Sequence, residues 1–456
     1  MTKLIPTAGL TLALSLLGGC MKKEDQPSEK LVFAHYMATL APKAGDATVE
    51  DYREEIRQAQ SHGIDGFSIN CGGWSVREPR YKERVLKIYE AARQENSGFR
   101  LMISADFASK LSLPEFKDMV ETFRDHPNQF RIEDRVVIST YSGGHTNEVT
   151  DFVAQEFTGK DKVFFLPYYH PRPANEMPTE KEIREVIATH PSVDGFFYFG
   201  AAGDPFELAR ISRDMSRLWH ESGRRYMAPV SPFYRGSGGN YRVFESHGFE
   251  GMQQLWLAAI ESDADFVQIV TWNDWGECTY VAPFGPVEQT ELWKGHWGPR
   301  LSHVAYLDAS RYYLDWYKTG RKPAITRDAL YYFYRPHPSH LQGVVEYRPH
   351  GREELRGKLG RPRLVETLVD RIHVTTFLTA PAELTVKCGG REETFPLQAG
   401  INNVSVPLQP GKPEFILTRD EQTLIQKQGE IAISADDAWA NFNYFSGSAT
   451  AAPPIR

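Results

Sequence analysis

The chain has 456 residues, a formal net charge of −7 and an aromatic content of 12%. This length exceeds that of one small domain and allows a large barrel with a second module. The acidic balance gives no overall basic field, so we expect no nucleic-acid partner.

The first twenty residues, MTKLIPTAGLTLALSLLGGC, predict a bacterial lipoprotein signal. Lys3 precedes an apolar segment too short for an ordinary spanning helix, and small residues come directly before Cys20. We expect a signal peptide over residues 1–19, a lipid anchor on Cys20 and a flexible tether over residues 20–29. Because Met21 rather than aspartate follows Cys20, we expect attachment to the outer membrane, facing the periplasm or the exterior. The alternative is a plain secretory signal with a chance cysteine.

Eight short apolar runs, separated by segments with helical patterning, predict parallel strands that alternate with helices. The runs are Leu31–Tyr36, Gly66–Asn70, Arg100–Phe107, Val136–Ser142, Val163–Tyr169, Gly195–Gly200, Arg225–Ser231 and Phe266–Trp272. They predict an α/β fold, a (β/α)8 TIM barrel over residues 30–335. A doubly wound open sheet is the competing architecture, but no glycine-rich phosphate loop follows the first run.

One segment between the runs, VEDYREEIRQAQSHG, shows the expected helical pattern. Tyr52, Ile56 and Ala59 fall on one face, and Gly63 is suited to end the helix. Asp65 and Asp194 precede their strands and are each followed by glycine, so we expect them to accept backbone hydrogen bonds in structural turns.

Three acids come at the ends of predicted strands, where a barrel of this type carries its chemistry. Asp106 ends the third run, and Asp274 and Glu277 follow the eighth within IVTWNDWGECTY. Paired carboxylates beside aromatic rings suit glycosidic cleavage, in which one acid protonates the leaving oxygen and the other activates water or attacks carbon. The alternative for Asp274 and Glu277 is a solvated loop or a helix N-terminus, where acids are favoured.

Other polar and aromatic side chains near the strand ends predict a cleft that binds a polysaccharide, because each sugar offers several hydroxyls. These candidate substrate-binding residues are His35, Tyr36, Asn70, Tyr141, Tyr168, His170, Trp272, Asn273, Trp275 and Tyr280. The remaining cysteines, Cys71, Cys278 and Cys388, are odd in number and lack CxxC spacing, and the histidines show no ligand spacing. We expect no metal and no cofactor.

From about residue 370 the pattern changes to short alternating strands punctuated by Gly and Pro, which predicts a small β-sandwich over residues 370–456 after a linker over residues 336–369. The sandwich could bind carbohydrate or serve only as a packing partner, and no aromatic stripe decides between them. We expect a monomer.

The chain resembles glycoside hydrolase family 71, the α-1,3-glucanases or mutanases. The resemblance rests on VFAHYM, IDGFSIN, ISADF, VSPFY, VQIVTWNDWGE and YYFYRPHP, and continues through VTTFLTAPAELTV and GINNVSVPL. It implies a metal-free barrel with an appended sandwich that cleaves α-1,3-glucan internally, with inversion. The implied functional acids are Asp106, Asp274 and Glu277, for which we predict Glu277 as general acid and Asp274 as general base, roles that could be exchanged.

Two features depart from the better-known fungal members of that family, namely the lipoprotein signal and Cys278 in the place of a familiar serine. Two alternatives remain open. One is an endo-α-mannosidase similar to glycoside hydrolase family 99, which typically shows WNE where this chain has Trp272-Asn273-Asp274. The other is a non-catalytic surface lipoprotein that binds glycans, since fold alone does not guarantee activity.

Overall fold

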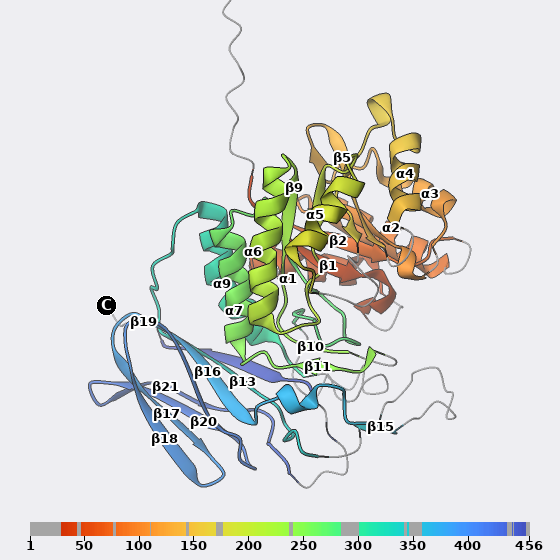
Figure 1. The fold of residues 1–456 in the computed structure, drawn as a ribbon. Helices are drawn as coiled ribbons and strands as arrows, with labels where there is room; N and C mark the ends of the chain where they lie inside the picture. Colours follow the sequence, from red (N-terminus) through yellow and green to blue (C-terminus); the bar gives the residue numbers. More distant parts are fainter. Residues whose placement is uncertain are drawn as a thin grey trace, which may run out of the picture.

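The structure, a computed structural model, describes residues 29–42, 47–75, 79–109, 111–142, 146–169, 177–236, 240–283, 301–341, 344–345, 358–435, 440 and 442–452. The predicted signal peptide, Cys20, nearly all of the tether, and His170 lie outside these residues. Figure 1 shows a parallel sheet covered by helices, with a group of antiparallel strands beside it. Within the described ranges no helix has the length and apolar character needed to cross a bilayer.

The parallel sheet follows the predicted runs closely. Its strands are β1 (Leu31–Met37), β2 (Gly66–Cys71), β3 (Arg100–Asp106), β5 (Arg135–Ser142), β6 (Phe164–Phe165), β7 (Tyr168–Tyr169), β8 (Gly195–Phe197), β9 (Arg225–Val230) and β12 (Phe266–Ile269). They lie in the order β5-β3-β2-β1-β12-β9-β8, with β6 and β7 paired to β5 and the short β4 (Arg131–Ile132) antiparallel to β5. Backbone hydrogen bonds from Asp194 N to Phe165 O (3.0 Å) and from Phe197 N to Pro167 O (2.9 Å) join the two ends of this order, so the sheet is curled.

The fifth predicted strand is interrupted. The run Val163–Tyr169 forms two short strands, β6 and β7, on either side of Leu166 and Pro167. Because Pro167 has no amide hydrogen, it cannot donate to the ladder with β5.

Helices cover the outer face of the curled sheet. They are α1 (Val49–Ser61), α2 (Pro79–Glu95), α3 (Leu113–Phe123), α4 (Thr146–Glu156), α5 (Glu180–Thr189), α6 (Pro205–Glu221), α7 (Phe249–Glu261) and α9 (Val304–Thr319). Helix α1 confirms the predicted face, because Tyr52, Ile56 and Ala59 are its buried residues, and Gly63 just after it has a φ of +87°. The Thr48 side chain caps its first turn by accepting from Asp51 N, and the Asp51 carboxylate accepts from Thr48 N in return.

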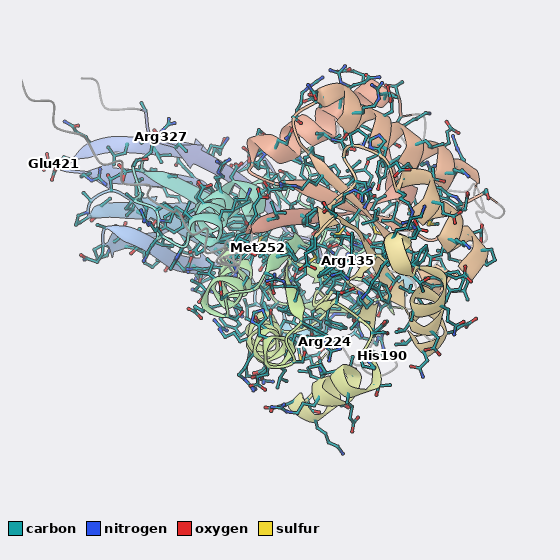
Figure 2. The ribbon with its side chains drawn as sticks, turned by 90° about the horizontal axis from the view of Figure 1, so that it is seen from above. Arg135, His190, Arg224, Met252, Arg327 and Glu421 are labelled. Atoms are coloured by element: carbon teal, nitrogen blue, oxygen red, sulfur yellow. The ribbon has the colours of Figure 1, made fainter. Side chains whose placement is uncertain are left out.

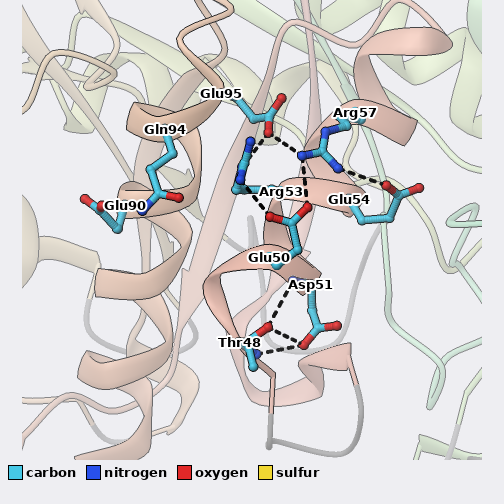
Figure 3. A network of polar contacts seen from close by, with 9 residues as sticks. All are labelled: Thr48, Glu50, Asp51, Arg53, Glu54, Arg57, Glu90, Gln94 and Glu95. Atoms are coloured by element: carbon cyan, nitrogen blue, oxygen red, sulfur yellow. Dashed lines mark hydrogen bonds and ion pairs between the residues drawn. The ribbon is translucent and has the colours of Figure 1, made fainter.

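An ion-pair network joins α1 to α2 on the molecular surface (Figure 3). The Glu95 carboxylate accepts from Arg53 (2.6 Å) and Arg57 (2.8 Å), and both arginines also reach Glu50. Glu54 pairs with Arg57 at 3.3 Å. Glu95 therefore holds two cations of the neighbouring helix.

Aspartates directly before three strands tie those strands to their neighbours. Asp65 accepts from Val32 N (2.8 Å), Asp194 from Phe165 N (2.9 Å) and Asp265 from Tyr226 N (2.9 Å). The structural role predicted for Asp65 and Asp194 is confirmed, and Asp265 repeats it. These bonds fix the register of adjacent strands at the amino ends of the sheet.

The C-terminal part contains two four-stranded antiparallel sheets. One has the order β19-β16-β13-β22, formed by β19 (Gly400–Pro407), β16 (Arg371–Leu378), β13 (Ala329–Tyr334) and β22 (Phe445–Thr450). The other has the order β18-β17-β20-β21, formed by β18 (Arg391–Leu397), β17 (Ala382–Cys388), β20 (Glu414–Arg419) and β21 (Gln422–Gln428). Figure 2 shows Glu421, in the turn between β20 and β21, far from Arg135 and His190 of the parallel sheet and its helices.

Strand β13 corrects the predicted boundary of the barrel. Residues up to 335 were expected to belong to the barrel, but Ala329–Tyr334 pairs with β16 and β22. Tyr331 and Phe333 face the core beneath the helices, whereas Leu330, Tyr332 and Tyr334 face a second core shared by the two antiparallel sheets. Alternation of side chains along a strand thus lets β13 serve both cores. Two short pairs, β10 (Tyr234–Arg235) with β11 (Val243–Phe244) and β14 (Val344–Val345) with β15 (Lys358–Gly360), complete the strands.

Candidate active site

Asp106 is the last residue of β3 and lies at the carboxyl end of the parallel sheet. Its Oδ2 accepts from Asn70 Nδ2 (3.3 Å) on the neighbouring strand β2, and its Oδ1 accepts from Ala108 N (3.0 Å). Tyr141 of β5 is its register partner on the other side. Three predicted residues therefore come together at one edge of the sheet.

The segment after β12 is hydrogen-bonded to the end of β1. Trp272 N donates to His35 O (2.8 Å), and the Asn273 side chain accepts from Met37 N (2.7 Å) while donating to Met37 O (3.2 Å) and Leu40 O (3.1 Å). Since Met37 is in register with Asn70, these bonds bring the WNDWGE segment to the same edge as Asp106. Asn273 is accordingly committed to the backbone of β1 and the turn after it.

Asp274 is enclosed at this edge, with only 9% of its surface exposed. Its amide donates to Thr271 Oγ1 (2.8 Å), and its Oδ1 accepts from Glu277 N (3.0 Å). Burial raises the pKa of Asp274 above its ordinary value, and the amides of Glu277 and Gly276 oppose the shift. Burial likewise raises the pKa of Asp106 to about 6, against the hydrogen bonds from Asn70 and from the backbone of Ala108 and Ser109. Two carboxyls with raised pKa values are suited to proton transfer near neutral pH.

Glu277 is half-buried and held by residues of β10. Tyr234 Oη donates to Glu277 Oε1 (3.1 Å) and accepts from Asn240 Nδ2 (2.6 Å), while Arg235 N donates to Glu277 O (3.0 Å). The sequence reasoning missed Tyr234, Arg235 and Asn240 as site residues. Tyr234 ends the motif VSPFY and follows the seventh predicted strand, so the rule used for the other strand ends would have found it.

Several predicted substrate-binding side chains are fully buried in packing. The Tyr36 hydroxyl donates to Glu55 Oε2 (2.5 Å) and Trp272 Nε1 donates to Glu55 Oε1 (3.3 Å), so both rings point toward α1. Tyr280 is buried, stacks on His303 with ring centroids 4.2 Å apart, and accepts from Asn443 Nδ2 (3.0 Å). The rings of Tyr36, Trp272 and Tyr280 thus present no exposed face to a sugar.

The remaining predicted residues lie nearer the sheet interior. His35 is buried beside Phe199, with ring centroids 5.3 Å apart, and burial lowers its pKa to about 3, so its imidazole is neutral. Tyr168 is buried against Tyr141, which itself is partly exposed. Trp275 packs on Tyr280, with ring centroids 4.6 Å apart, and keeps 6% of its surface exposed. Of the described aromatic candidates, Tyr141 keeps the most accessible surface.

The fold and site together define a class. A curled parallel sheet carries three carboxyls at the carboxyl ends of its strands, and no group of three or more His, Cys, Asp or Glu among the described residues could hold a metal ion. This is the arrangement of an α/β enzyme, whose functional groups lie at the carboxyl ends of the strands.

Comparison with known proteins gives the family. Residues 28–455 match the model of glycosyl hydrolase family 71, and the chain belongs to that family, so it is a glycoside hydrolase. It is 29% identical to a mutanase of Penicillium rubens over 93% of this chain and 90% of the relative. It is 27% identical to a glucan endo-1,3-alpha-glucosidase of Schizosaccharomyces pombe over 92% of this chain and 95% of the relative. A solved endo-alpha-mannosidase of family 99 from Bacteroides thetaiotaomicron is similar at 16% identity and a TM-score of 0.49, over 64% of this chain and 98% of that one.

Proposed function

We propose that this protein hydrolyses α-1,3-glucosidic linkages within a polysaccharide, with inversion at the anomeric carbon. The observation that carries the proposal is the convergence of Asp106, Asp274 and Glu277 on one edge of the parallel sheet through Asn70 and Asn273. The similar proteins named for α-1,3-glucan cleavage support the choice of linkage.

In the proposed reaction, Glu277 protonates the glycosidic oxygen as its bond to the anomeric carbon breaks. Asp274 takes a proton from the water whose oxygen bonds to that carbon from the opposite face. Asp106 orients this water or raises the pKa of a neighbouring acid by charge repulsion. An inverting reaction requires acid and base carboxyls roughly 6.5–9.5 Å apart, which leaves room for the water.

The first experiment incubates the purified protein with α-1,3-glucan, α-mannan and starch and follows released reducing ends. We expect release from α-1,3-glucan, with β-configured ends as the first product by NMR and a mixture of oligosaccharides that indicates internal cleavage. Release from mannan alone, or α-configured first products, would overturn the substrate or the stereochemistry respectively.

The acid and base roles are tested with two variants and an activated substrate. Glu277→Gln and Asp274→Asn should each lower kcat on glucan by about 10²–10⁴-fold. Fluoride leaves without protonation, so an α-1,3-glucooligosaccharyl fluoride should still be cleaved by Glu277→Gln but not by Asp274→Asn. The reverse pattern would exchange the two roles, and wild-type activity in either variant would contradict the site.

We infer a finer architecture as well: the curled sheet is the inner wall of a (β/α)8 barrel, and the two antiparallel sheets are a β-sandwich. The bonds from Asp194 and Phe197 to the β6–β7 segment support a closed ring, and the apolar core between the antiparallel sheets supports a sandwich. An experimental structure with an open gap between β7 and β8 would contradict the first inference.

We also propose that residues 1–19 are removed and that Cys20 carries lipid in the outer membrane, on the basis of the sequence alone. Labelled palmitate fed to the producing bacterium should enter the wild-type protein and not Cys20→Ser, and membrane fractionation should recover the label in the outer membrane. Equal labelling of both proteins would exclude Cys20 as the anchor. We propose that the protein is monomeric, which sedimentation of the detergent-solubilised form can test.

A further inference from the structure

Arg235 is a buried cation whose guanidinium is directed at a cysteine. Only 4% of its surface is exposed, and its Nε and Nη2 donate to Cys278 Sγ at 3.2 and 3.0 Å. Cys278 is itself buried and directly follows Glu277. A buried guanidinium keeps its charge, so it needs oriented acceptors, and here two of its donors converge on one sulfur atom.

Two further bonds join Tyr234 and Arg235 to Glu277, and a third supports Tyr234. Arg235 N donates to Glu277 O (3.0 Å), Tyr234 Oη donates to Glu277 Oε1 (3.1 Å), and Asn240 Nδ2 holds the Tyr234 hydroxyl (2.6 Å). The pair Tyr234-Arg235 therefore contacts the pair Glu277-Cys278 at a carboxylate, a carbonyl and a thiol. Tyr234 thus holds the carboxylate of Glu277, and the Arg235 amide holds its backbone carbonyl.

The backbone of Cys278 has an unusual conformation at this contact between Arg235 and Cys278. Cys278 has a φ of +56°, a left-handed conformation that few residues with a side chain adopt. Such a conformation persists where surrounding contacts determine it. The Arg235 guanidinium on Sγ and the Arg235 amide on the preceding carbonyl are two such contacts, on either side of the peptide bond that joins Glu277 to Cys278.

We propose that Arg235 and Cys278 form a positioning pair that holds the Glu277 carboxyl against Tyr234. Neither residue touches the substrate; the pair acts through the backbone of Glu277. This inference rests on the proposed role of Glu277 in the reaction. The requirement at position 278 is a compact acceptor for two guanidinium donors, which a hydroxyl can also meet and a methyl group cannot.

The test compares Cys278→Ser and Cys278→Ala with the wild-type protein, by crystal structure and by kinetics on α-1,3-glucan. Cys388→Ala is the matched control, because Cys388 is a buried thiol in the distant antiparallel sheet whose neighbours are the backbone carbonyls of Gln409 (3.1 Å) and Gly411 (3.9 Å). In Cys278→Ala we expect the Glu277 carboxyl to leave Tyr234, kcat to fall by about 10–100-fold and KM to change by less than about threefold, because small displacements of a reacting group are costly to the rate. Cys278→Ser should keep the carboxyl in place and most of the activity, and Cys388→Ala should match the wild type.

The outcomes separate this inference from the proposed function. If the Glu277 carboxyl stays on Tyr234 in Cys278→Ala, the positioning pair is overturned whatever the activity. If the carboxyl moves but kcat and the pH profile do not change, the pair is structural and the proposal also fails. A wild-type protein inactive on α-1,3-glucan would contradict the proposed function, while the crystal structures would still decide whether Cys278 positions Glu277.

Discussion

Asp106 is an acid whose ionisation the folded protein disfavours. It is half-buried at the end of β3, where burial raises the pKa of its carboxyl to about 6 while Asn70 and two backbone amides favour the charged form. An acid that is costly to ionise is retained here, at the edge where Asp274 and Glu277 also lie. Ionisable groups with shifted pKa values are common at functional sites.

This shift predicts a pH-dependent gain in stability for Asp106→Asn. Between the ordinary pKa of 3.8 and about 6, the folded protein holds a proton that the unfolded chain releases, so the contribution of Asp106 to stability falls as the pH rises through this window. Asparagine does not titrate, so the Asp106→Asn variant does not lose stability in this way. Its advantage over the wild type in free energy of unfolding should grow by on the order of 2 kcal/mol between about pH 4.5 and about pH 7.5.

Urea unfolding at the two pH values measures this effect. The activity of Asp106→Asn on α-1,3-glucan should be lower than that of the wild type. Asp420→Asn, in the exposed turn between β20 and β21, is the control for the same aspartate-to-asparagine change far from this edge of the parallel sheet. An advantage of Asp106→Asn that is equal at both pH values would contradict the raised pKa of the Asp106 carboxyl.

Among the secondary-structure elements, the outer helices are joined by charges whose worth depends on their exposure. Glu95 at the end of α2 keeps 12% of its side chain exposed and pairs with Arg53 and Arg57. Glu54, which pairs with Arg57, keeps 56% of its side chain exposed. Solvent screening weakens exposed pairs, so the two glutamates should differ in their contributions.

Glu95→Gln should therefore lower the free energy of unfolding by about 1 kcal/mol at low ionic strength, and Glu54→Gln by no more than a few tenths. The loss in Glu95→Gln should shrink in about 1 M salt, because the charges are then screened. Thermal unfolding at two salt concentrations measures both. Equal losses in the two variants would show that burial of Glu95 does not strengthen the network.

At this scale the strands could be predicted well and the site only in part. Runs of apolar residues indicated the parallel strands, and the position of Asp106, Asp274 and Glu277 after them indicated the edge of the sheet at which these acids lie. The sequence pattern could not show that the Tyr36 and Trp272 side chains point toward Glu55 of α1. Alternation along a strand assigns side chains to two opposite faces, but it does not say which face the helices cover. It also missed β13 as a shared strand, since YYFY is apolar on both sides and gives no sign of two separate cores.

Across the whole molecule, one buried ionic cluster joins the helix-covered sheet to the antiparallel strands. The Glu245 carboxylate accepts from Arg335 (3.1 Å), Tyr444 (2.5 Å) and Val369 N (2.9 Å), and Arg335 also pairs with Asp370 at 2.7 Å. The side chains of Arg335 and Glu245 are 1% and 4% exposed. Removing one member would leave an uncompensated charge between the two parts.

Arg335→Met should lower the free energy of unfolding by about 3–5 kcal/mol, the usual cost of breaking a buried pair. Lys387→Gln, which breaks a pair with exposures of 41% and 56%, should cost less than about 1 kcal/mol. Guanidinium unfolding followed by tryptophan fluorescence measures both variants. A loss below about 1 kcal/mol in Arg335→Met would show that the cluster does not bind the two parts together.

The hydrogen bonds between Asn273 and Met37 also bear on the order in which the fold forms. These residues are 236 positions apart in the chain, yet their side-chain and backbone bonds bring the WNDWGE segment to the strand edge that carries Asp106. Contacts between such distant positions form late, because a long stretch must be ordered first. A ribosome-bound chain that stops short of β12 contains only one of the three acids, so the three acids come together late, when β12 pairs with β1.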